Sequence, residues 1–236
     1  MHARIDAAFV SNNPRSRWEL GREELYKGVV AMKRLVGVAT FVICGPALAA
    51  APANKIYWTQ WVFERLQTID RPGIARGIIA LKHYKSVLVY YHGEVENPNE
   101  LGGPGPNWTP ASTFSGGTVG EHPPFGNKIV LNGGPLTKVD AFHFSRPVTN
   151  PIIAIFSLGA VSQLAELVFP KSYSLSLESG GPSTWYGGSS VVLNGTTVSG
   201  MEGNGTIQFN GTFSAINFTT PIDEYSYSIT VGIPQP

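Results

Sequence analysis

Aromatic side chains in glycine-rich segments are the residues of this sequence whose type and position first suggest chemistry. Trp108 lies in a segment rich in Gly, Pro and Asn, and Trp185 and Tyr186 lie in the run Gly180–Gly188. Sugars present apolar C–H faces that stack on aromatic rings, while polar groups nearby fix their orientation. We therefore predict that Trp108, Trp185 and Tyr186 bind glycan from exposed loops. The alternative is that the rings fold back as lids over the end of the core.

Three common catalytic motifs are missing from the sequence. It has no Gly-x-Ser-x-Gly elbow, no His-Glu-x-x-His and no phosphate-binding loop. A glycosidase needs two carboxylates in one cleft, and sequence alone pairs none of the Asp and Glu residues. His92 and His143 lie in strand-like runs and are expected at the surface. We assign no catalytic residue and predict a non-enzymatic protein, with a hydrolase that lacks a recognisable motif as an open alternative.

Three acidic residues near turns are candidate calcium ligands. Glu202 lies in Glu-Gly-Asn-Gly, and Asp223 and Glu224 are adjacent. Calcium takes carboxylate and carbonyl oxygens, but the Asp-rich loop of an EF-hand is missing here. No cofactor is expected, and calcium stays open beside the interpretation of Glu202 as an ordinary turn residue.

Short strands are the elements that must position these residues. Runs rich in β-branched and aromatic residues, separated by turn residues, are typical of β-strands. Residues 97–113 predict a long surface loop, and residues 161–168 carry a short helical pattern. Ten or more strands without intervening helices predict an all-β fold, an antiparallel β-sandwich of jelly-roll type. The predicted strands cover 56–63, 74–81, 86–95, 128–131, 138–145, 151–158, 172–178, 190–193, 196–200, 205–210, 212–219 and 225–233.

Asn-Gly pairs separate several of these runs. The pair supplies the two positive-φ residues of a type I′ turn, so each predicts a β-hairpin. Residues 206–209 and 212–218 alternate in polarity, which predicts one buried and one wet face. The four pairs are Asn132-Gly133, Asn194-Gly195, Asn204-Gly205 and Asn210-Gly211.

An export signal precedes the predicted sandwich. Met32-Lys33-Arg34 is followed by an apolar run from Leu35 to Cys44 and by Ala47-Leu48-Ala49. A basic start, a short apolar run and a small-residue cleavage site are the parts of a secretory signal peptide. We therefore predict that residues 1–31 are an extension from a mis-called start, with an unusually long basic region of the signal as the alternative. We also predict that 32–50 is the signal peptide and that 51–236 is one domain.

Composition limits the partners of the predicted domain. The whole chain has a net charge of +1 and a single cysteine, which lies inside the predicted signal. A near-neutral balance argues against nucleic acid as a partner, because nucleic-acid binders need a basic face. The apolar run is too short to span a bilayer, so no stable membrane span is expected after cleavage. The expected location is secreted: periplasmic, extracellular or at the cell surface.

Four phrases, at residues 107–119, 144–159, 200–213 and 230–233, resemble a group of exported bacterial proteins of the PEP-CTERM-associated type. The resemblance covers most of residues 56–233, and it implies a cell-surface or matrix setting and carries no catalytic motif. The sorting tail of that group is missing after Ile233 in this sequence.

These observations together predict an exported binding protein that recognises extracellular polysaccharide. The alternative is a structural surface or matrix subunit that self-associates through exposed sheet edges.

Processing of the signal is directly testable. Because residues 32–50 carry the parts of a signal peptide, the exported protein should begin close to Ala50. Amino-terminal sequencing of secreted material measures this. A secreted protein that retains the residues from Met1 to Arg34 would refute both the signal and the mis-called start.

Overall fold

The computed structural model describes residues 53–96, 107–134, 139–224 and 226–236. The predicted extension 1–31, the predicted signal 32–50 and most of the predicted loop 97–113 lie outside these residues. In the described part of the chain, no helix has the length and apolar character needed to cross a membrane.

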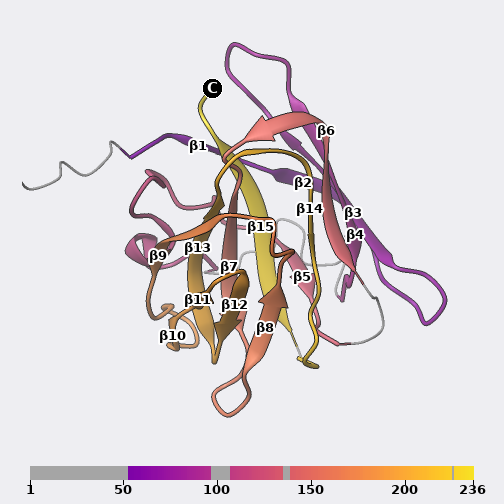
Figure 1. Cartoon of the computed structure of the whole chain (residues 1–236), viewed down its shortest axis with the longest axis vertical. Coiled ribbons are helices and arrows are strands. Elements are labelled where there is room, and N and C mark those ends of the chain that lie inside the picture. The colour runs from indigo at the N-terminus through magenta and orange to yellow at the C-terminus, as the bar shows by residue number, and fades with distance from the viewer. Residues whose placement is uncertain (1–52, 97–106, 135–138, 225) are drawn as a thin grey trace, which may run out of the picture. The chain divides into compact units, whose positions relative to one another are not determined.

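Strands make up nearly all of the regular structure, and they stack in two layers (Figure 1). The helix α1 is one turn, Ala111–Phe114. The strands are β1 (Ile56–Trp58), β2 (Gln60–Arg65), β3 (Gly73–Ile79), β4 (Val87–Gly93), β5 (Ile129–Leu131), β6 (Asp140–Thr149), β7 (Ile152–Leu158), β8 (Ala165–Val168), β9 (Leu175–Gly180), β10 (Ser189–Ser190), β11 (Val192–Asn194), β12 (Thr197–Gly200), β13 (Gly203–Phe209), β14 (Thr212–Phe218) and β15 (Tyr227–Pro234).

The first layer is a seven-stranded sheet with the order β1-β15-β7-β13-β10. Strand β5 also pairs with β15, and β9 also pairs with β13. All of its pairs are antiparallel except the two-residue pair of β10 with β13. The carboxyl end of β7 therefore lies beside the amino ends of β13 and β15.

The second layer combines two smaller sheets. One has the order β14-β6-β4-β3-β2 and the other the order β11-β12-β8. Val168 and Thr219 join them by two backbone hydrogen bonds of 2.8 and 3.0 Å. One hydrophobic cluster contains residues of both layers, such as Phe142 and Val89 from the second and Ile153 and Ile207 from the first. The predicted all-β antiparallel sandwich is confirmed, and the jelly-roll path stays a prediction.

A second hydrophobic cluster covers the outer face of the seven-stranded sheet. It joins Ile152, Ala154 and Phe156 of β7 to Trp108 and Phe114 of the loop that carries α1. The central strands β7 and β13 are buried along their whole length as a result. The alternation predicted for residues 206–209 is therefore wrong, whereas β14 does alternate.

Trp108 corrects the prediction of an exposed loop. Its side chain is 0% exposed, and its ring centroid lies 5.3 Å from that of Phe114 and 6.3 Å from that of Phe156. The neighbouring Asn107 and Thr113 are buried as well. The described part of this segment is a cover packed on the sheet, and it removes the apolar outer face of β7 from water.

Two further predictions from local patterns are wrong. Residues 165–168 form strand β8 and pair with β12, although their pattern is helical. Of the four Asn-Gly pairs, Asn194-Gly195 alone joins two paired strands. The pair Asn210-Gly211 carries the chain from β13 in one sheet to β14 in the other, and Asn204-Gly205 lies inside β13. An Asn-Gly pair permits a sharp bend, but it does not decide which strand becomes the partner.

Truncating Trp108 tests the role of this cover. Trp108→Ala should lower the free energy of unfolding by about 3–5 kcal/mol, the cost of removing a large buried aromatic ring. The matched variant Trp185→Ala removes an exposed ring and should change stability by less than about 0.5 kcal/mol. Urea unfolding of the full chain measures both. Equal stability of the two variants would show that Trp108 is not part of the core.

Candidate functional site

A pocket opens where β7 ends in the seven-stranded sheet. Ser157 lies at the end of β7, Glu202 directly precedes β13, and Glu224 lies shortly before β15. Because β13 and β15 run antiparallel to β7 on its two sides, these three residues from distant parts of the sequence meet at one edge. The pocket has a volume of about 600 Å³.

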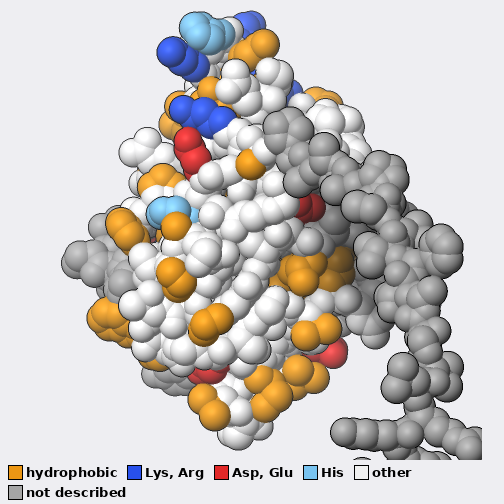
Figure 2. All heavy atoms as spheres, turned by 90° about the vertical axis from the view of Figure 1, so that its left-hand side faces the viewer, with side chains coloured by type: hydrophobic (Ala, Val, Ile, Leu, Met, Phe, Trp, Pro, Cys, Tyr) orange, Lys and Arg blue, Asp and Glu red, His pale blue; other side chains and the backbone are white. Residues whose placement is uncertain are grey.

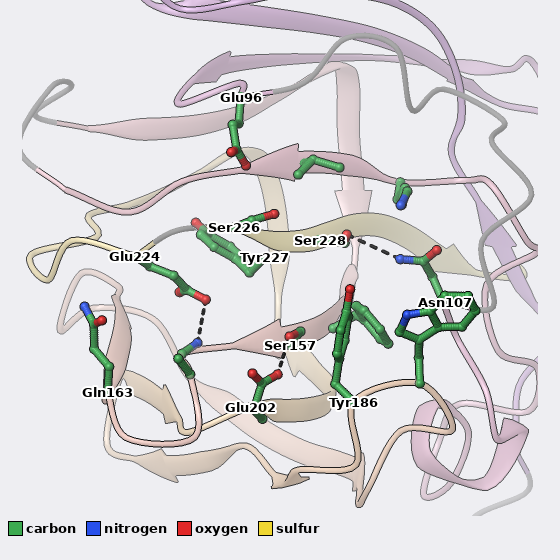
Figure 3. A pocket seen from close by; sticks show the side chains of 16 residues that line it. Glu96, Asn107, Ser157, Gln163, Tyr186, Glu202, Glu224, Ser226, Tyr227 and Ser228 are labelled. Carbon is green, nitrogen blue, oxygen red and sulfur yellow. Dashed lines mark hydrogen bonds between the residues drawn. The ribbon is translucent and has the colours of Figure 1, made fainter. Parts of the chain in front are cut away.

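Acidic and aromatic side chains both line this pocket (Figure 3). Figure 3 shows the carboxyl groups of Glu202 and Glu224 directed into the same space, with Tyr186 and Gln163 at its sides. Lys128 is the basic residue among those that line it. The lining also includes Glu96, Phe156, Trp185, Tyr227 and Ser228.

Glu202 is held by its backbone and by one hydroxyl group. Its φ of +53° and the φ of +60° at Ser157 lie in the left-handed region, which residues other than glycine rarely adopt. The Ser157 hydroxyl donates a hydrogen bond of 2.5 Å to Glu202 Oε2. Backbone strain of this kind persists where the surrounding structure enforces it, and it is concentrated at functional sites.

Glu224 is a carboxyl group with an unusual protonation equilibrium. Burial raises its pKa to about 8, the Gly159 N–H opposes this, and repulsion from Glu202 and Glu96 adds to it. The Gly159 N–H donates to Glu224 Oε1 over 2.7 Å. The other oxygen, Oε2, is buried and has no hydrogen-bond partner among the described residues. Glu224 is therefore mostly protonated at neutral pH.

The aromatic wall of the pocket is a tight turn. Ser183 and Gly187 exchange two backbone hydrogen bonds, and the Ser183 hydroxyl accepts one from the Tyr186 N–H. Trp185 and Tyr186 at the tip are each 59% exposed, and their ring centroids are 6.5 Å apart. The Tyr186 ring lies 6.0 Å from that of Phe156, which connects it to the buried cover.

The amide of Asn204 ties these parts together. The side chain is 1% exposed. Its Oδ1 accepts a hydrogen bond from the Ser157 N–H, and its Nδ2 donates to the carbonyl groups of Gly187 and Glu202. One side chain therefore sets the positions of the end of β7, the acidic corner and the aromatic turn.

The site residues predicted from the sequence differ in their exposure and in whether they line the pocket. Trp185 and Tyr186 line the pocket and are exposed, while Trp108 is buried and outside its lining. Glu202 and Glu224 line the pocket, whereas the exposed Asp223 does not. In the described part of the chain no three His, Cys, Asp or Glu residues stand close enough to hold a metal ion.

Several pocket residues gave no signal in the sequence. Ser157, Gln163 and Tyr227 lie in ordinary strand or turn segments, and Asn204 fits an Asn-Gly turn. The glutamates gave a partial signal, because each lies in a turn, but their proximity to one another follows from the sheet alone. His92 and His143 are exposed, as expected, and both lie outside the pocket.

A buried polar network lies in the same domain. Asp140 Oδ1 accepts hydrogen bonds from the Tyr91 hydroxyl over 2.6 Å and from the Glu94 N–H over 2.9 Å. Thr220 donates to Glu94 Oε2. Burial raises the pKa of Asp140 to about 6, although both hydrogen bonds oppose the shift. Burial and the charges of Asp140, Glu94 and Glu224 raise the pKa of Tyr227. Tyr227 therefore lies near the buried network of Asp140 and Glu94 and also near Glu224.

The fold and the pocket define a class: an all-β sandwich with a carboxylate-rich, aromatic-walled pocket at one end of its larger sheet. Comparison of the chain with protein-family models, with curated proteins and with solved structures finds no match. The function therefore has to be inferred from the pocket itself.

The raised pKa values predict how stability depends on pH. A carboxyl group whose pKa is higher in the folded state binds more protons there, so stability falls as pH rises from the unfolded pKa to the folded one. Asp140 contributes up to about pH 6 and Glu224 up to about pH 8. The loss is at most about 1.4 kcal/mol per pH unit for each group.

Urea unfolding at pH values between 4 and 8 measures this dependence. In the wild-type protein, stability should decline across the range. Glu224→Gln should flatten the curve between pH 6 and pH 8 and leave below pH 6 only the part of the decline that Asp140 causes. A wild-type curve that rises between pH 6 and pH 8 would contradict the assignment.

Proposed function

We propose that this protein is an exported carbohydrate-binding protein that holds its ligand in the pocket at the end of β7. The observation that carries the proposal is the exposed pair Trp185 and Tyr186 at the rim of a pocket lined with carboxyl, amide and hydroxyl groups. Rings of this kind stack on the apolar faces of sugars. Carboxylates and amides accept and donate the hydrogen bonds that orient hydroxyl groups.

The support beneath the aromatic turn favours a binding role. Two exposed aromatic rings cost free energy in water, and this turn keeps them in place by its own hydrogen bonds, by Asn204 and by the contact of Tyr186 with Phe156. A ring that is held before the ligand arrives loses little entropy on binding. This is an efficient arrangement for stacking.

Self-association is the less favoured alternative. Stable association of subunits needs a large surface with an apolar centre. On the face in Figure 2, hydrophobic side chains form several separate groups among polar ones. The pocket, in contrast, combines volume, convergent polar groups and exposed rings at one place.

Hydrolysis of a glycosidic bond is a second candidate, favoured by one observation. Glu202 and Glu224 point into the same pocket, and Glu224 is protonated at neutral pH. A glycosidase uses one protonated carboxyl group as the acid and a second carboxylate as base or nucleophile. In that role Glu224 would protonate the leaving oxygen and Glu202 would act on the opposite side.

The binding proposal is tested by removing the rings singly. Trp185→Ala and Tyr186→Ala should each weaken binding of soluble oligosaccharides by about 1–3 kcal/mol, by analogy with the loss of a nucleic-acid base stacked on an aromatic ring. The full chain is first screened on a glycan array, and calorimetry then measures the affinity of each variant. New reducing ends in the same incubations would show hydrolysis, the second candidate.

Matched controls are available elsewhere on the surface. Phe125 is 59% exposed and Tyr84 is 54% exposed, and neither lines the pocket. Phe125→Ala and Tyr84→Ala should leave binding unchanged. Wild-type protein that binds no glycan, or four variants that bind equally well, would refute the proposal.

A further inference from the structure

The charge balance of the pocket selects among carbohydrates. Three glutamates, Glu96, Glu202 and Glu224, line it together with a single basic residue, Lys128. Repulsion from Glu202 and Glu96 contributes, after burial, to the raised pKa of Glu224. The three carboxyl groups are therefore close enough to interact, and Lys128 is the one cation among the described residues that line the pocket. An acidic sugar would add to the repulsion.

Glu224 Oε2 is a buried oxygen atom of the pocket that has no hydrogen-bond partner among the described residues. The hydroxyl oxygen of Tyr227 is also buried without a partner among them, but this ring packs in the core between the two layers, where Asp140 is the charged group that affects its pKa most. A buried polar atom without a partner costs free energy, so a ligand that displaces the Glu224 proton and donates to Oε2 gains what the protein alone lacks.

An ammonium group matches both features. It carries three N–H donors, no acceptor and a positive charge. It also interacts favourably with the face of an aromatic ring, and Tyr186 and Trp185 form the neighbouring wall. A hydroxyl group supplies one donor and no charge, and an N-acetylated amine loses the charge. The chemistry of this pocket therefore favours an ammonium group over a hydroxyl group and over an N-acetylated amine.

Resting on the proposed function, we propose that the ligand is an amino sugar with a free ammonium group, bound between Glu202 and Glu224 beside the aromatic wall. The preferred substrate class is thus a glucosamine-type oligosaccharide that lacks its N-acetyl groups. Neutral sugars would bind more weakly in the same pocket, and uronic acids would be excluded.

A released proton should accompany binding. In the free pocket Glu224 faces Glu202, Glu96, Lys128 and Tyr227, and it is mostly protonated below pH 8. An ammonium group favours the ionised carboxylate, since an opposite charge nearby stabilises the charged form. Binding of an amino sugar at pH 6 should therefore expel the proton of Glu224, whereas binding of a neutral sugar should not.

Calorimetry of the full chain at pH 6 tests the proposal. The probes are three (1→4)-linked tetrasaccharides, made of glucosamine, of N-acetylglucosamine and of glucose, each titrated in two buffers of different ionisation enthalpy. The glucosamine tetramer should bind at least about tenfold more tightly than the other two, a difference of about 1.4 kcal/mol. It alone should give an enthalpy that depends on the buffer.

Charge-neutral variants separate the pocket from the overall charge. Glu224→Gln should abolish proton release and reduce the preference for the glucosamine tetramer, with little effect on the neutral tetramers. Glu166→Gln removes the same charge from β8, outside the pocket, and should change neither quantity. Thermal unfolding of both variants shows that they are folded at pH 6.

Each remaining outcome has a distinct meaning. Equal binding of all three tetramers would overturn the inference and leave carbohydrate binding intact. Binding of none of them, with no hit on the glycan array, would overturn both. Spermidine that binds as tightly as the glucosamine tetramer would show recognition of amines without the sugar and would overturn the proposed function as well.

Discussion

The side-chain amide of Asn204 is the contact on which the pocket depends. It accepts a hydrogen bond from Ser157 and donates to the carbonyl groups of Gly187 and Glu202, so it links one strand end to two turns. A buried amide can do this because it carries an acceptor and two donors in one rigid plane. The same contacts satisfy backbone groups that would otherwise be costly to bury, so stability and the shape of the pocket have a common cause.

The buried cover of the seven-stranded sheet is the second support of the site. Trp108 and Phe114 pack on Phe156, and Phe156 lies against Tyr186 at the rim. The chain thus uses a fully buried tryptophan to hold the surface on which exposed rings stand. Trp108 therefore supports the rim of the pocket through Phe156, although Trp108 itself does not line the pocket.

Features that lower the stability of the folded protein are concentrated around the acidic groups of this pocket. Ser157 and Glu202 have left-handed backbone conformations, and Glu224 keeps a proton that most glutamates lose near pH 4. Each feature lowers stability at neutral pH, where a less acidic pocket would be more stable. The surrounding antiparallel sheet supplies the hydrogen bonds and buried area that keep these residues in place. A ligand that relieves the repulsion recovers part of that cost.

Local patterns in the sequence predict the strand-rich character, the positions of most strands and the exposure of Trp185 and Tyr186, because side-chain alternation and glycine turns act over a few neighbouring residues. The same patterns place Glu202 and Glu224 in turns. The burial of Trp108, the strand at residues 165–168 and the crossing of Asn210-Gly211 between sheets follow from long-range packing. Only the tertiary structure brought Ser157, Glu202 and Glu224 together. The physical reason is that a strand's partner is selected by which apolar faces the whole chain can bury, and β7 meets β13 and β15 through contacts that no local pattern contains.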